Sequence, residues 1–235
     1  MSISSKSPDQ IKKMRLAGKL ASSVLEMIGE HVKTGVTTEE LDQICHNFIV
    51  NDLDSVPAPL NYNGFPKSIC TSVNNVVCHG IPSEKKLKKG DIINIDITII
   101  KDGFHGDTSK MFIIGKPSVK ALKICNVARD SMMLGIEKVR PGIHLGEIGK
   151  VIGAYVHSKN CSVVRDYCGH GIGEVFHELP QVIHYDDGKI SQSPILEPGM
   201  TFTIEPMVNL GGYEVITSRI DGWTVTTKDL SLIHI

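Results

Sequence analysis

An internal repeat constrains the fold of this chain more than any other sequence feature. The segment VKTGVTTEELDQI at 32–44 aligns with VRPGIHLGEIGKV at 139–151, at a constant offset of 107 residues. Glycine, glutamate and branched apolar residues occupy matching positions, and the tripeptide HGI at 79–81 recurs at 170–172. Such self-similarity indicates that one supersecondary unit has been duplicated. We therefore predict a fold with two related halves.

Both halves are predicted to begin with a pair of helices. Ser7 and Thr37 are each followed three positions later by Gln or Glu, the pattern of a capping box at a helix N-terminus. Apolar residues at helical spacing continue from each cap. The second half repeats this order, with expected helices at 121–138 and 146–157, and strand-like sequence follows each pair.

The predicted fold class is α/β (α+β). Each half would supply a helix pair followed by antiparallel strands, and the two halves would share one curved sheet with helices on its outer face. No long linker or low-complexity stretch divides the chain. We therefore predict one domain over 1–229, composed of halves at about 7–115 and 117–229.

Two aspartates lie in the clearest predicted hairpin. Residues 91–100 and 104–114 alternate like strands around an Asp-Gly dipeptide at 102–103, which is typical of tight hairpin turns. Pairing around that turn places Asp96 and Asp107 on one face, either opposite each other or one diagonal step apart, about 5–8 Å between Cβ atoms. Two carboxylates there would repel unless one is protonated or both bind a cation. A solvated sheet face with two ordinary acids is the alternative.

The second half adds histidine and a further acid. His170 lies in the glycine-rich GHGIG, His177 follows in VFHELP, and Glu205 interrupts the apolar run TFTIEPM. Carboxylate and imidazole ligands without thiolate suit Mn, Co, Fe or Zn, and they fit a two-metal hydrolytic site. His79 lies in the other HGI copy without matching acids beside it, so a substrate or proton-transfer role fits it better.

Composition excludes several other classes of protein. The chain has 25 Lys and Arg against 26 Asp and Glu, a formal net charge of -1, so it offers no basic excess for nucleic acid. With 41% hydrophobic residues it is not a disordered chain, and no apolar run reaches the roughly 18–20 residues of a membrane span. The polar start and six scattered cysteines without a CxxC pair predict a cytoplasmic protein with free thiols.

Five segments together resemble the bacterial type I methionine aminopeptidases, of the pita-bread metallopeptidase family. They are GFPKSIC, VNNVVCHGIP, GDIINIDITIIKDGFHGDTSKMF, YCGHGIGEVFHELP and EPGMTFTIEPM. The resemblance extends from about Ser7 to Asp229 and implies the pita-bread fold, a pseudo-two-fold α/β domain. It also implies metal-dependent removal of the initiator methionine from nascent proteins when the second residue is small. The implied partners are nascent polypeptides with an N-terminal Met and the ribosome, and nothing in the sequence requires more than a monomer.

The resemblance also assigns roles to individual residues. Two divalent ions (Co, Mn, Fe or Zn) would be held by Asp96, Asp107, His170 and Glu205. Substrate contact and proton transfer would fall to His79 and His177. The methionine side chain would lie among Tyr62, Phe65, Cys70, Phe176 and Trp223, because aromatic rings and a thiol suit a polarizable thioether. Without the resemblance, Trp223, the only tryptophan, would be expected in the core.

The end of the chain departs from the family. Family members carry a fifth metal ligand, a Glu in a final-strand motif like YEHT, whereas no carboxylate follows Asp229 here. Loss of that strand is expected to weaken metal binding, to impair activity and to expose a sheet edge. The last six residues, LSLIHI, match the translation of a common transposon-type sequencing adapter. We therefore predict that residues 230–235 are a non-native tail on a truncated gene.

Two other functions remain open at this point. A pita-bread peptidase acting on X-Pro bonds is disfavoured, because the chain is short for the extra N-terminal domain often found there. A non-catalytic pita-bread module that binds protein or RNA would be expected to have lost its metal ligands, whereas four of the five are retained here. Metal binding therefore discriminates between the enzyme and the binding module.

Overall fold

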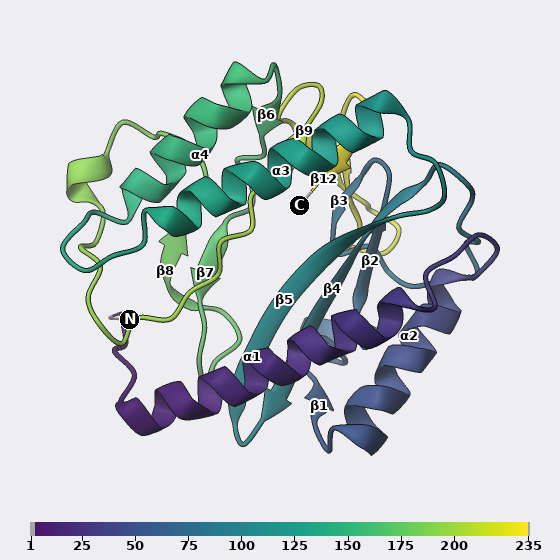
Figure 1. Ribbon diagram of the computed structural model, residues 1–235, viewed down its shortest axis with the longest axis horizontal. Helices are drawn as coiled ribbons and strands as arrows, with labels where there is room; N and C mark the ends of the chain where they lie inside the picture. Colours follow the sequence, from purple (N-terminus) through teal and green to yellow (C-terminus); the bar gives the residue numbers. More distant parts are fainter. Residues whose placement is uncertain (1–2, 235) are drawn as a thin grey trace.

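Among the residues that the computed structural model describes, 3–234, α-helices form one pair in each half. Helices α1 (Pro8–Gly29) and α2 (Thr38–Asn47) belong to the first half, and α3 (Val119–Glu137) and α4 (Gly146–Ser158) belong to the second (Figure 1). The predicted order of helix, break and helix is therefore present twice. The limits of the two second-half helices differ from the predicted ones by at most two residues.

Side-chain caps explain where the first-half helices begin. The Gln10 N–H donates to Ser7 Oγ at 3.3 Å, and the Glu40 N–H donates to Thr37 Oγ1 at 3.0 Å. In return, each cap N–H donates to the Gln or Glu side chain, which completes both predicted capping boxes. These bonds satisfy N–H groups that a helix cannot pair internally.

A hairpin of β4 (Ile92–Lys101) and β5 (Phe104–Ile113) is the longest strand pair of the first half. Its turn residues Asp102 and Gly103 have φ values of 50° and 80°, the left-handed geometry of a type I′ turn. Asp and Gly adopt this geometry more readily than other residues, so the dipeptide fixes where the hairpin reverses.

The hairpin register decides how the two aspartates meet. Thr98 pairs with Asp107 and Asp96 pairs with Ser109, so Asp96 and Asp107 are one diagonal step apart on one face. This is one of the two arrangements that the sequence predicted. Side chains alternate along a strand, and the isoleucines at 93, 95, 97 and 99 are fully buried against the helices. Asp96 and Thr98 therefore face the opposite side of the sheet.

The other strands are short: β1 (Val56–Pro57), β2 (Cys70–Val73), β3 (Val76–Cys78), β6 (Ser162–Val163), β7 (Gly169–Gly171), β8 (Glu178–Val182), β9 (Val208–Asn209), β10 (Val215–Thr217), β11 (Val225–Thr227) and β12 (Ile233–His234). Strands β1, β2 and β5 all pair with β4. First-half strand β3 pairs with second-half strand β11, and the other groups are β12–β9–β6 and β7–β8. The predicted shared sheet is thus divided into hydrogen-bonded groups, because the second-half strands are short and shift register.

Two hydrophobic cores lie between helices and strands. One joins α1 and α2 to the buried face of β2 and β4, and the other packs α3 on α4 and extends to Val208 in β9. Figure 1 shows α1 crossing β4 and β5, with α3 and α4 grouped on the other half. The faces of β4 and β5 that point away from the helices line the cavity described below.

The cysteines, the helices, the edge of β5 and the C-terminal strand each bear on a prediction made from the sequence. The cysteines are all free, as predicted. Within residues 3–234 no helix combines the length and apolar character that crossing a membrane requires. Within the same range β5 pairs only with β4, so the edge of β5 away from β4 has no strand partner. Ile233 is buried and pairs with Asn209, while residue 235 lies outside the described residues. The non-native origin of 230–235 stays a prediction.

Candidate active site

A cavity of about 1360 Å³ lies between the two halves of the molecule. Both halves contribute to its lining, and so do both copies of the HGI motif. All eleven predicted site residues line it: Tyr62, Phe65, Cys70, His79, Asp96, Asp107, His170, Phe176, His177, Glu205 and Trp223. The fold therefore brings together side chains that are up to 161 positions apart in the sequence.

Three carboxylates converge on one wall of this cavity. Asp96 and Asp107 come from β4 and β5, and Glu205 comes from the segment that precedes β9. The Thr98 hydroxyl donates to Asp107 Oδ1 at 3.0 Å, and the Thr203 hydroxyl donates to Glu205 Oε1. A threonine hydroxyl thus fixes one oxygen of each of these two carboxylates.

His170 faces the carboxylates with one ring nitrogen. Its Nε2 lies 3.5 Å from Asp107 Oδ2 and 3.6 Å from Glu205 Oε1. Its Nδ1 lies 2.9 Å from the carbonyl oxygen of Gly171, which can only accept, so the Nδ1–H donates there. With its proton on Nδ1, the neutral ring offers the Nε2 lone pair on the side of the two carboxylates, where it could serve as a metal ligand.

The charges of this cluster are poorly compensated within the protein. Burial raises the pKa of Asp96 well above its usual range, and the negative charges of Asp107 and Glu205 raise it further. Burial likewise raises the pKa of Glu205 to about 7, with Asp107 adding to the shift. Although burial lowers the pKa of His170, the hydrogen bond that the protonated ring donates to Asp107 and the charge of Glu205 raise it above the usual value overall. A bound cation would relieve these costs.

The chemistry of these donor atoms fits a divalent transition metal. Among the described residues no group of three is already spaced as a metal site. The separations of 3.5 and 3.6 Å between ligand atoms are nevertheless what two ligands about 2.1 Å from one ion can have. Oxygen and imidazole donors favour Mn, Fe, Co or Zn.

A histidine and two aromatic rings form another part of the cavity lining, beside His170. The Tyr62 hydroxyl is 2.8 Å from His177 Nδ1, and Phe176 stacks on His177 with ring centroids 4.2 Å apart. The His177 ring lies 4.3 Å from His170, centroid to centroid. Burial lowers the pKa of His177 to about 4, and nearby His170 adds to that effect. His177 is therefore a neutral imidazole at pH 7.

Four further lining residues, three of them from the first half, complete the predicted set. Phe65 meets Trp223 edge-on at 5.2 Å, and His79 lies 6.0 Å from the same indole ring. Cys70 pairs with Asp96 across β2 and β4, and burial raises the pKa of its thiol, which keeps it neutral. Trp223 is half-buried at the cavity, so the expectation of a core tryptophan is wrong.

A family model, Metallopeptidase family M24, matches residues 12–234 of the chain. The chain belongs to this metallopeptidase family. It is 58% identical to the methionine aminopeptidase of Escherichia coli K12 over 233 residues, which cover 99% of this chain and 87% of that relative. It is 56% identical to the methionine aminopeptidase of Rickettsia prowazekii over 220 residues, 94% of this chain and 84% of that one.

Solved structures show the same fold as this M24 chain. The crystal structure of the Rickettsia prowazekii methionine aminopeptidase matches with a TM-score of 0.96 and 53% identity, covering 99% of this chain and 93% of that one. The Thermotoga maritima methionine aminopeptidase matches with a TM-score of 0.94 and 33% identity, covering 99% and 92%. The pita-bread fold is therefore confirmed. Prolidase from Pyrococcus furiosus, at 20% identity and a TM-score of 0.72, shares the fold alone.

Three further residues of this M24 site were missed by the sequence reasoning. The Nδ1 of His105 lies 3.0 Å from the Gly173 carbonyl oxygen, and its ring stacks on Phe176 at 5.3 Å. Thr203 accepts the His170 N–H at 3.0 Å, and His184 Nε2 accepts the Glu205 N–H at 3.2 Å. His105 lies two residues before Asp107 on the same face of β5, and Thr203 lies two residues before Glu205, a spacing that could have found them. No sequence signal marks His184.

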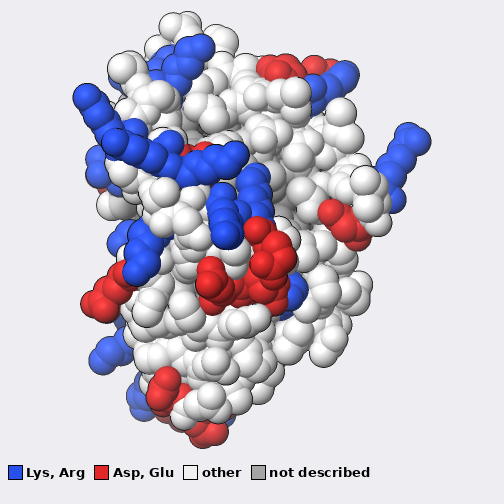
Figure 2. All heavy atoms as spheres, turned by 90° about the vertical axis from the view of Figure 1, so that its right-hand side faces the viewer, with Lys and Arg blue, Asp and Glu red and all other residues white. Residues whose placement is uncertain are grey.

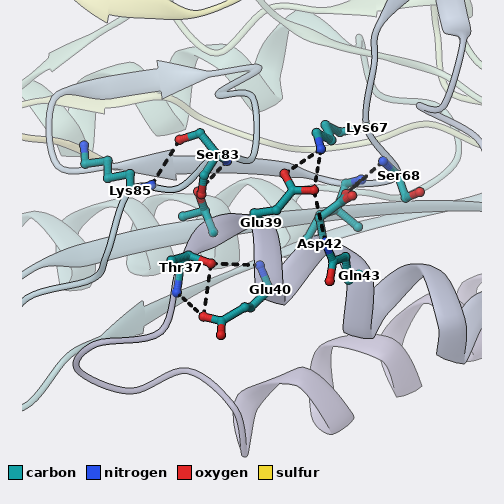
Figure 3. A network of polar contacts seen from close by, with 11 residues as sticks. Thr37, Glu39, Glu40, Asp42, Gln43, Lys67, Ser68, Ser83 and Lys85 are labelled. Carbon is teal, nitrogen blue, oxygen red and sulfur yellow. Dashed lines mark hydrogen bonds and ion pairs between the residues drawn. The ribbon is translucent and has the colours of Figure 1, made fainter.

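A polar network joins α2 to the segment before β2 (Figure 3). The Asp42 carboxylate is 6% exposed and accepts the Ser68 N–H at 2.9 Å and the Ile69 N–H at 3.1 Å. Lys67 donates to Glu39 at 2.6 Å beside it. Both contacts hold the segment that leads from Phe65 into β2. Burial raises the pKa of Asp42, because it disfavours the ionised carboxylate. The hydrogen bonds from the Ser68 and Ile69 N–H groups act in the opposite direction and offset only part of this effect.

We expect Asp42→Ala to lower the free energy of unfolding by about 2–4 kcal/mol, because two buried N–H groups lose their acceptor together. Urea unfolding followed by circular dichroism measures this loss. Asp9→Ala serves as the control, because the Asp9 side chain is 86% exposed and its ion pair with Lys12 lies in solvent. A loss below about 1 kcal/mol for Asp42→Ala would show that the two N–H groups find water instead.

Proposed function

We propose that this chain is a methionine aminopeptidase, a metal-dependent hydrolase that removes the N-terminal Met of new proteins when the second residue is small. The observation that carries the proposal is the convergence of carboxylates, histidines and an aromatic wall in one cavity of an M24 chain. Identities of 56–58% to named methionine aminopeptidases over nearly the whole chain support the substrate.

The proposed cofactor is a pair of divalent ions (Co, Mn, Fe or Zn) held by Asp96, Asp107, His170 and Glu205. When bound, such ions supply Lewis acidity and a more acidic water for attack on the peptide carbonyl. The support for this site is its charge: three acids share a cavity wall with one imidazole. Thr98 and Thr203 orient Asp107 and Glu205, and the Gly171 carbonyl orients His170.

His79 and His177 are proposed to bind the substrate and to move protons at the scissile bond. His177 is held by Tyr62, and its low pKa makes it a neutral group that can donate one proton or accept one. His79 has a left-handed φ of 54° and is half-buried, with a pKa that burial lowers. Both rings are therefore neutral before the reaction, and each can exchange a proton with the substrate as charge develops at the carbonyl.

The methionine side chain is proposed to occupy the wall formed by Tyr62, Phe65, Cys70, Phe176 and Trp223. Aromatic edges and a neutral thiol contact a thioether favourably. The neighbouring carboxylates Asp96 and Glu205 are also suited to receive the positively charged amino terminus of a peptide. An exopeptidase needs such a feature, because it must distinguish a chain end from an internal peptide bond.

The deciding experiment is hydrolysis of the peptide Met-Ala-Ser by the metal-free protein and by the same protein after addition of Mn²⁺ or Co²⁺. We expect release of Met only with metal, and at least about 10²-fold less release from Met-Trp-Ser, since the second residue must be small. Ala-Pro dipeptide is the probe for the X-Pro peptidase reading. Metal binding without release of Met from any of these peptides would overturn the proposed activity, and absence of metal binding would favour a non-catalytic module.

We further propose that the enzyme acts as a monomer in the cytoplasm and contacts the ribosome, where nascent chains emerge. A chain of net charge -1 has no general attraction for RNA, so any such contact must be local. The turn after α1 and the loop before β4 pair through Gly35 and Leu87, and they gather exposed lysines at 33, 85, 86, 88 and 89. Figure 2 shows Lys and Arg side chains grouped on this side of the molecule.

The lysine group can be tested by ribosome cosedimentation at several salt concentrations. Substitution of Lys85, Lys86, Lys88 and Lys89 by Ala is expected to weaken binding about 10-fold or more and to flatten its dependence on salt, because fewer counterions are released. Double substitution Lys12→Ala and Lys13→Ala, on the exposed face of α1, is the control. Equal loss in both variants would assign the effect to net charge rather than to this group.

A further inference from the structure

The chain segment before α1 is attached to the loop that carries Phe176 and His177. Lys6 ion-pairs with Glu178, the first residue of β8, and the two side chains are only 6% and 18% exposed. The Ser4 hydroxyl donates to the same Glu178 oxygen at 2.8 Å. The Lys6 N–H also donates to the Gly199 carbonyl at 2.8 Å, so backbone and side chain are both fixed.

Lys6 holds this loop at both of its ends. At the exit, its ammonium group binds Glu178, which follows His177 directly in the chain. At the entry, its side chain lies across Gly173 so closely that a Cβ on that residue would collide with it. His105 supports the other side, since its N–H donates to the Gly173 carbonyl at 2.9 Å. The loop between the two anchors carries the Phe176 and His177 rings to the cavity.

The Lys6 side chain is buried and the Glu178 side chain is mostly buried, so the ion pair can rearrange little without a cost in free energy. An exposed ion pair contributes little to stability and tolerates rearrangement, whereas a buried carboxylate that loses its cation must find water or another partner. Glu178 is 18% exposed, so without Lys6 it would gain further water contact by turning outward, and such a move would draw the adjacent His177 away from Tyr62 and His170. Surface pairs such as Lys12 with Asp9, 78% and 86% exposed, have no such consequence.

We propose that Lys6 is a positioning residue for the active site, which sets the places of Phe176 and His177 through Glu178 and Gly173. Lys6 touches neither the carboxylate cluster nor the aromatic wall, so its effect is carried by the loop. The inference rests on the proposed function only for its catalytic consequence. The attachment itself can be tested without any activity.

The first test is amide hydrogen exchange in the metal-free full chain. Lys6→Met keeps most of the side-chain length and removes the charge. We expect exchange in the peptide covering 171–182 to become at least about 10-fold faster, with no change in α2. Lys12→Met is the matched control and should change neither region. Unchanged exchange at 171–182 in Lys6→Met would overturn the proposal; if that variant does not fold, Glu178→Gln removes the same ion pair and gives the same comparison.

The second test is a double-mutant cycle on Met-Ala-Ser hydrolysis. Lys6→Met is expected to lower kcat/KM about 10-fold in the native background and less than about 2-fold in a His177→Ala background, because it acts through His177. Equal losses in both backgrounds would indicate a general structural effect and overturn the catalytic part of the inference. If the native chain itself releases no Met, the proposed function fails, while the exchange experiment still decides whether Lys6 holds the loop.

Discussion

Asp107→Asn is expected to lower kcat/KM for Met-Ala-Ser by about 10³-fold or more. The Asp107 Oδ2 atom lies 3.5 Å from His170 Nε2, and its Oδ1 atom receives a hydrogen bond from Thr98. The amide that replaces it is neutral and presents an NH₂ group to one of its two neighbours. Loss of one charged ligand removes several kcal/mol of the stabilisation that a metal gives the transition state, and about 4 kcal/mol corresponds to 10³ in rate.

The control for this prediction lies on the same hairpin. Asp102→Asn makes the same chemical change in the exposed type I′ turn, where Asn adopts left-handed geometry as readily as Asp. We expect activity within about 2-fold of the native chain, and bound metal unchanged by elemental analysis. Full metal content together with full activity in Asp107→Asn would remove Asp107 from the ligand set.

The sequence predicts the fold best where a local chemical rule decides the structure. The Ser7 and Thr37 capping boxes and the Asp-Gly turn are each specified within four residues, and all three are present. The turn also fixes the hairpin register, which is why the relation of Asp96 to Asp107 could be predicted to within one diagonal step. The division of the sheet into groups was not predictable, because it depends on contacts between short strands from both halves.

The site shows the same distinction between local and long-range information. Buried acids and histidines among glycines can be recognised as single letters in an apolar context. The residues that hold these side chains in place cannot be recognised in the sequence. His184 accepts the Glu205 N–H across 21 positions, and Lys6 binds Glu178 across 172. A lysine in a polar N-terminal segment has no sequence pattern that marks it as buried. Such residues become visible only when the fold places them beside the groups that they support.

Glu205→Gln is expected to stabilise the metal-free protein at alkaline pH and to make its stability less sensitive to added metal. Burial and the charge of Asp107 raise the pKa of Glu205 to about 7 from 4.5, so folding favours its protonated form. Gln imitates that neutral form. The substitution should therefore remove a cost of up to about 3 kcal/mol at pH 8.5. Urea unfolding in the presence of a chelator measures the difference.

The sign of the pH dependence separates this effect from ordinary packing. Stability from a group with a raised pKa is fully present below pH 4.5 and is lost as the pH rises through about 7, so native and variant proteins should be equally stable near pH 4. Comparing the two proteins cancels the opposite contributions of His177 and His184, whose pKa values burial lowers. Mn²⁺ at about 100 times its Kd should then remove most of the difference at pH 8.5, since the native protein gains about 2.7 kcal/mol from bound ligand and the variant gains less. Glu197→Gln, at an exposed position, should follow the native curve throughout. A Glu205→Gln advantage that persists at pH 4, or that Mn²⁺ leaves unchanged, would place Glu205 outside the metal site.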